Sequence, residues 1–257
     1  MRVRAEQGAG VIEILGAAGL LAFAVSSISV GVRCTLSGFR NRQLPELAIG
    51  LGFLAGVLFG YVPESLATST DLVPAQLQPA LLAVTQVAIR AAALAVMIFT
   101  LAVFSRRGAT GWAIFTVVSA ALLVSWVAFP HYLSQAQGPD DVFWYEVFSV
   151  SRSLAVAWGA VESLVYWRMS ARRRDLGLSE AAVTNRFLLW GLGLSALTCL
   201  MASTTLAGLA GIDPTAYGWV IFESGMGLIG AVSLWLAFFP ARAYLQWVDR
   251  RAASQRS

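Results

Sequence analysis

Four charged residues lie inside long apolar stretches of the chain and are the first candidates for chemistry. They are Arg90, Arg152, Glu162 and Glu223. A charge at the centre of a bilayer costs roughly 2.5–3.5 kcal/mol on insertion scales, so such residues commonly mark ligand sites, ion pathways or buried ion pairs. The planar guanidinium of arginine suits carboxylate and phosphate groups. These residues therefore predict either structural ion pairs or an anion-binding site.

The composition identifies the environment of these charges. Of 257 residues, 58% are hydrophobic and only 12% are charged. Soluble domains carry about 25% charged residues. The chain is therefore predicted to be an all-α polytopic membrane protein, with membrane lipids around it and no nucleic-acid partner.

Apolar segments of the length needed to cross a bilayer recur along the chain. They predict a single seven-helix transmembrane domain over residues 1–257. The predicted spans are about 11–31, 46–62, 81–104, 111–130, 144–166, 187–211 and 218–239, and residues 240–257 form a tail.

The connections between these spans alternate in charge. Fourteen of the 18 basic residues, all arginine, lie in the 32–45, 105–110 and 167–186 connections and in the tail. The opposite connections, 63–80, 131–143 and 212–217, contain acidic residues and no arginine. The positive-inside rule then places the N-terminus outside and the C-terminus in the cytoplasm, although Arg2 and Arg4 weakly oppose this. The predicted location is a bacterial-type inner membrane.

This topology brings three of the charges to similar depths. With ~1.5 Å per residue, Arg90, Arg152 and Glu223 lie about 14, 12 and 8 Å below the outer boundary. Glu162 lies deeper, four residues after Trp158 and on the same helix face.

Two main interpretations of these charges stay open. In the structural one, the arginines pair with Glu223, Glu13 or Glu146 and pin helices together. In the functional one, an outward-facing cavity holds a small anionic ligand through Arg90, Arg152 and Glu223, with Trp158 and Glu162 as further ligand-binding residues. A third alternative is a proton or ion path through Glu223 and Glu162.

Several chemistries are excluded by what the sequence lacks. The chain has no lysine for a retinal Schiff base and a single histidine, His131, where a multi-histidine zinc site needs several. The GxGxxG pattern of residues 225–230 falls inside a predicted membrane helix, whereas a dinucleotide site needs a strand before it. No catalytic constellation, metal site or cofactor is predicted.

Three further features concern contacts. Gly52, Gly56 and Gly60 recur every fourth residue, which predicts close helix packing within the chain or a homodimer seam. The Arg168–Arg186 connection sets the topology and contacts anionic lipid, or it docks a cytoplasmic protein partner. The tail after Pro240 forms a short amphipathic helix on the inner membrane surface or a frayed basic end.

Two phrases, Gln43-Leu44-Pro45-Glu46-Leu47 leading into GLGF and Asn185-Arg186-Phe187-Leu188-Leu189-Trp190-Gly191, resemble uncharacterised bacterial seven-helix membrane proteins. The resemblance covers most of the chain and implies an architecture but no function. That architecture is similar to the rhodopsin and receptor class only by analogy, because the seventh span has no lysine. The sequence thus favours a receptor-like or sensory protein, with a small-anion or proton transporter or channel as the alternative.

Overall fold

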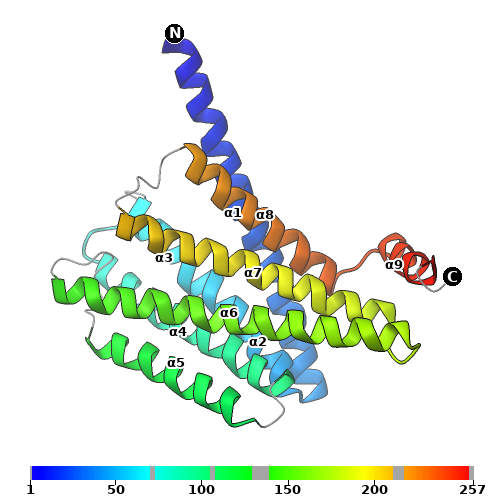
Figure 1. Cartoon of the computed structure of the whole chain (residues 1–257). Coiled ribbons are helices and arrows are strands. Elements are labelled where there is room, and N and C mark those ends of the chain that lie inside the picture. The colour runs from blue at the N-terminus through cyan, green and yellow to red at the C-terminus, as the bar shows by residue number, and fades with distance from the viewer. Residues whose placement is uncertain (1, 70–72, 105–107, 129–138, 211–216, 255–257) are drawn as a thin grey trace. The chain divides into compact units, whose positions relative to one another are not determined.

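The computed structural model describes residues 2–69, 73–104, 108–128, 139–210 and 217–254, and these residues form helices and short connections with no strand among them (Figure 1). The prediction of an all-α chain is therefore confirmed. The helices are α1 (Arg2–Asn41), α2 (Leu44–Leu54), the π-helix η1 (Ala55–Tyr61), α3 (Val62–Ser69), α4 (Gln78–Val103), α5 (Ala109–Ala128), α6 (Pro139–Asp175), α7 (Ala181–Ala210), α8 (Tyr217–Phe238) and α9 (Arg242–Ser254).

Within these ranges, six helical segments are long and apolar enough to cross a membrane, which indicates a multi-pass membrane protein. They are Leu21–Asn41, Leu44–Ala67, Gln78–Val103, Ala109–Ala128, Ala181–Ala207 and Gly218–Phe238. Helix α6 has 37 residues and is long enough. Arg152 and Glu162 interrupt its middle, however, and lower its apolar character below that of the six segments.

The chain forms two compact units. Unit 1 contains residues 1–26 and 159–257, and unit 2 contains residues 27–158. Helices α1 and α6 each contribute one part to each unit.

The interior of unit 2 is built around α4. Half of its apolar stretch is buried, against about a fifth for α5, whose buried residues Val118, Leu122 and Ser125 form one stripe at helical spacing. The apolar core joins α4, α5 and α6 through Ile89, Ala93, Met97, Val118, Leu122, Phe148, Ala155 and Trp158.

The Gly52/Gly56/Gly60 face packs on α4 within this unit. A Cβ atom at Gly52 would lie 2.7 Å from the Ala95 Cβ, and one at Gly60 would lie 2.9 Å from the Ile89 Cγ1. The missing side chains let the two backbones approach closely. The structure thus shows the packing alternative, and because α4 covers this face it is closed to a second copy.

The prediction of a non-helical connection over residues 32–45 is wrong, because most of this stretch is helical. Helix α1 continues to Asn41, and Arg42 then adopts a left-handed conformation with φ 54°. The Gln43 N–H donates to the Gly38 carbonyl at 3.0 Å, which closes the helix end. Helix α2 begins at once, at Leu44.

Glycines let α1 and α2 pack closely on each side of this turn. A Cβ atom at Gly38 would lie 2.6 Å from the Leu47 nitrogen, and one at Gly50 would lie 2.5 Å from the Thr35 nitrogen. Real Cβ atoms do not approach backbone atoms this closely, so larger residues at either position would force the helices apart.

In unit 1, α8 packs against α7 and against the first part of α1. A Cβ atom at Gly227 would lie 3.2 Å from the Gly19 carbonyl oxygen, and one at Gly193 would lie 3.4 Å from the Leu234 Cγ. The GxGxxG pattern lies inside helix α8, where Gly227 has a packing role and Gly225 faces open space.

The predicted connection 167–186 is also mostly helical. Helix α6 runs to Asp175 and ends where Gly177 adopts φ 74°. There the Leu178 N–H donates to the Arg173 carbonyl at 2.8 Å. Helix α7 begins at Ala181, so only five residues connect the two helices.

The other predicted connections differ in extent as well. Helix α3 occupies the first part of the predicted 63–80 connection, and α6 begins inside the predicted 131–143 connection. His131 and the Glu13 side chain lie outside the described part of the structure.

Candidate functional site

Arg90 lies on the buried face of α4, and its side chain is 5% exposed. Its Nη1 donates to the carbonyl of Gln86 at 3.1 Å and to the Gln86 Oε1 at 2.7 Å. Its Nε donates to the Leu122 carbonyl on α5 at 3.4 Å. Among the described residues, the acceptors that hold this guanidinium are therefore neutral.

Phe148 on α6 joins Arg90 to a second arginine. Its ring is 3% exposed, and its centroid lies 3.9 Å from the Arg90 Cζ and 5.2 Å from the Arg152 Cζ. The negative face of an aromatic ring attracts a cation, most strongly where water is excluded. Two guanidiniums thus share one buried ring.

Arg152 is half-buried and lies one helical turn after Phe148. Its Nε is buried and has no hydrogen-bond partner among the described residues. It interacts electrostatically with Arg90, which it repels, and with Glu64 on α3, which it attracts. We call Glu64, Gln86, Arg90, Phe148 and Arg152 the Arg90 cluster.

The π-helix η1 connects α2 to the residues that carry Glu64, and it packs beside α4. The Thr85 hydroxyl of α4 donates to the Gly60 carbonyl of η1 at 3.4 Å. A π-helix holds more residues in each turn than an α-helix, and such segments occur frequently at functional sites. Residues after η1, including Glu64, are therefore rotated about the helix axis relative to a continuous α-helix.

The structure brings together some of the predicted site residues. Arg90 and Arg152 meet at Phe148, and Trp158 is buried in the same apolar core as Phe148. Glu162 and Glu223 belong to unit 1 and are half-buried there.

The Glu223 carboxylate has a partner on its own helix. Its Oε1 accepts a hydrogen bond from the Trp219 Nε1 at 2.9 Å, one turn earlier in α8. This contact links Glu223 to an indole, whereas the sequence predicted an arginine or a ligand as its partner.

Three members of the cluster were missed in the sequence. Gln86 and Phe148 each precede an arginine by four residues, a spacing that places both pairs on one helix face. This spacing could have predicted that Gln86 and Phe148 lie beside the two arginines. Glu64 gave no such signal, because the sequence placed it in a connection and the π-helix that extends the second apolar segment has no sequence signature.

The Arg90 cluster contains cationic, acidic, amide and aromatic side chains. Among the described residues, no group of three acidic, histidine or cysteine side chains could hold a metal ion. The cluster has two guanidiniums beside the buried Phe148 ring and one carboxylate, Glu64, which interacts electrostatically with Arg152.

No protein-family model, curated protein or solved structure matches the chain. The function proposed below therefore depends on the geometry of the Arg90 cluster.

Proposed function

We propose that the chain is a receptor-like or sensory seven-helix membrane protein that binds a small anion at the Arg90 cluster. One observation supports this most directly: Arg90 is 5% exposed, its guanidinium is held by neutral acceptors, and it shares the Phe148 ring with Arg152. Two guanidiniums with one carboxylate leave a net positive charge at a largely buried site, and a bound anion would compensate it.

The half-buried Arg152 is the side of the cluster that a ligand would reach. Its buried Nε has no described acceptor, and arginine can hold a carboxylate or phosphate with two parallel hydrogen bonds. Glu64 balances one of the two positive charges. A ligand with a single negative charge would balance the other.

In this proposal, helix α6 also crosses the membrane and brings the six apolar segments to seven crossings. Its 37 residues extend about 55 Å at ~1.5 Å per residue, well beyond the ~30 Å hydrocarbon layer. The arginine distribution supports an outside N-terminus, a cytoplasmic C-terminus and a bacterial-type inner membrane. A cytoplasmic protein that docks at the Arg168–Arg186 segment would receive the signal.

Thermal unfolding of the purified full chain in detergent tests anion binding, with acetate and phosphate as probes. We expect an anion to raise the unfolding temperature of the wild type and to lose this effect in Arg152→Gln. Arg173→Gln, at the exposed end of α6, is the matched control and should keep the effect. Arg152 is half-buried, so its neutral variant is expected to fold.

The anion site is contradicted if Arg152→Gln and Arg90→Gln are both stabilised as much as the wild type. Equal loss in Arg173→Gln would also contradict it, because that result would indicate general attraction to a basic surface.

A small-anion or proton transporter or channel is the second candidate, and the π-helix favours it. Helix η1 lies beside α4 in the same unit as Arg90, where a change between π and α geometry would move Glu64. Flux measured in liposomes distinguishes the two functions. If flux is present in the wild type and lost in Glu162→Gln, the protein is a transporter or channel and the receptor function is contradicted.

A further inference from the structure

We infer that unit 1 contains a second binding site, which takes the phosphate-bearing headgroup of an anionic lipid. A pocket of about 450 Å³ lies between the end of α6, the start of α7 and the tail helix α9. Arg174 and Arg251, together with Asn185, Tyr244 and Trp247, are among the residues that line it. This site lies outside the Arg90 cluster and does not depend on the function proposed for it.

Helix α9 forms one wall of the pocket, and a hydrogen bond to α7 holds it in place. The Asn185 Nδ2 on α7 donates to the Tyr244 hydroxyl on α9 at 2.7 Å. Val248, one turn after Tyr244, is buried. The tail helix is therefore attached to α7 by this hydrogen bond and buries Val248.

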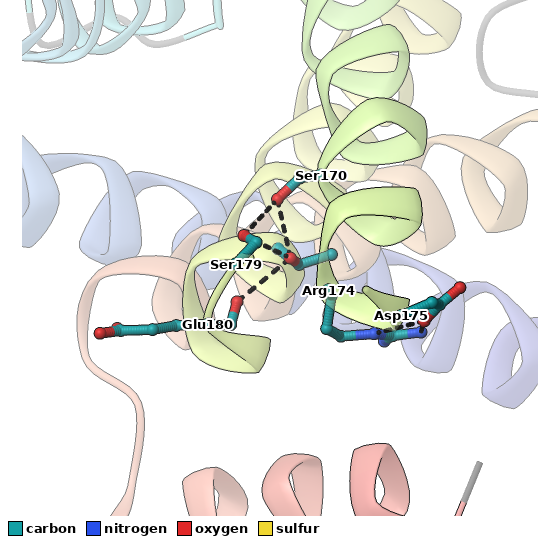
Figure 2. Close-up of polar contacts among 6 residues, drawn as sticks. Ser170, Arg174, Asp175, Ser179 and Glu180 are labelled. Atoms are coloured by element: carbon teal, nitrogen blue, oxygen red, sulfur yellow. Dashed lines mark hydrogen bonds and ion pairs between the residues drawn. The ribbon is translucent and has the colours of Figure 1, made fainter. Parts of the chain in front are cut away.

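The opposite wall consists of the end of α6 and the start of α7, which side-chain hydrogen bonds hold together. The Ser170 hydroxyl lies 2.8 Å from the Thr184 hydroxyl and 2.9 Å from the Ser179 hydroxyl. Figure 2 shows Ser170 and Ser179 pointing toward one another at this turn. The Thr184 hydroxyl also lies 3.1 Å from the Glu180 carbonyl, to which it donates. These bonds fix the ends of both helices, so this wall is preformed.

Cationic groups lie beside aromatic ones in this pocket. The Arg251 Cζ lies 5.3 Å from the Trp247 ring centroid, and Tyr244 and Trp247 are stacked at 5.9 Å. Arg174 contacts Asp175 at 3.0 Å, which balances part of its charge. Guanidiniums with amide and hydroxyl donors are suited to a phosphate group.

The apolar walls and the size of the pocket select an amphipathic anion. Leu188 and Trp167 line it together with the polar groups. Pockets of roughly 300–1,000 Å³ hold drug-sized ligands, so this one is larger than an inorganic ion requires. Basic segments at a membrane surface attract anionic lipids, and aromatic rings favour the headgroup level. A lipid phosphate with its glycerol group matches all of these properties.

The thermal unfolding temperature of the full chain in detergent tests the site. Three additives are compared: phosphatidylglycerol, phosphatidylcholine and soluble glycerol phosphate. We expect phosphatidylglycerol alone to raise the unfolding temperature of the wild type. Arg251→Gln should weaken this lipid's apparent affinity by ~10-fold, the equivalent of one charge-assisted hydrogen bond.

Arg250→Gln is the matched control, because Arg250 is the preceding residue on α9, is exposed and does not line the pocket. It should keep the response of the wild type. Equal weakening in both variants, or an equal effect of phosphatidylcholine, would overturn the site. An equal effect of glycerol phosphate would show a free-phosphate site and overturn the lipid assignment.

Discussion

Arg90 in unit 2 and Glu223 in unit 1 are both charges within apolar helices, and both have a partner one helical turn away. Their surroundings differ. Arg90 contacts Gln86 on α4, a carbonyl on α5 and a ring on α6. The hydrogen bond of Glu223 to Trp219 stays within α8. An intramembrane charge becomes part of the core only where several helices surround it, and burial therefore distinguishes the two sites.

The largest expected effect comes from Arg90→Ala. The change removes a buried side chain, leaves a cavity and deprives the Gln86 side chain of its donor. We expect the free energy of unfolding to fall by roughly 3 kcal/mol. Chemical unfolding in micelles measures this, with the exposed Arg173→Ala as control, for which about 0.5 kcal/mol or less is expected. Similar losses in both variants would show that Arg90 is not part of the core.

An intermediate effect is expected for Gly50→Ala, which tests the close packing of α1 and α2. The new Cβ would lie 2.5 Å from the Thr35 nitrogen, and the helices would have to separate. Overpacking of this kind costs about 1–3 kcal/mol. Gly225→Ala in α8 is the matched control, because its Cβ meets open space. The control should be neutral or slightly stabilising, since alanine is the better helix former.

The smallest effect is expected for Glu223→Gln. The amide oxygen of glutamine can still accept the hydrogen bond from the Trp219 Nε1, and the half-buried site loses only its charge. Unfolding in the same micelles should change by about 0.5 kcal/mol or less. A loss as large as that of Arg90→Ala would mean that Glu223 is as tightly enclosed as Arg90, and it would remove the contrast between the two units.

The sequence predicted the helical class, and six of its seven predicted spans overlap apolar segments that the described residues contain, because composition and length determine both. The sequence did not predict correctly where the helices end. The 32–45 stretch, with Arg33 and Arg40, is predicted as a connection, yet α1 continues through both arginines to Asn41. Charge sets topology across a membrane, whereas local hydrogen bonds such as that of Gln43 to Gly38 determine where a helix ends.

For the Arg90 cluster, the two arginines could be predicted and their surroundings only in part. Depth along each helix placed Arg90 and Arg152 at one level, and both meet at Phe148. Which carboxylate joins them depends on helix rotation. The π-helix changes that rotation and extends the second apolar segment to Glu64, and neither effect follows from residue spacing.

The tight turn at Arg42 also limits how the protein can move. Two residues link α1 to α2, and a slide of one helical turn would shift them by ~5.4 Å. Such a slide would break the bond from Gln43 to Gly38 and drive Leu47 into the backbone of α1. The part of α1 in unit 2 and helix α2 are thus expected to move together, and any bending along the second apolar segment is expected at the wider turns that follow Leu54.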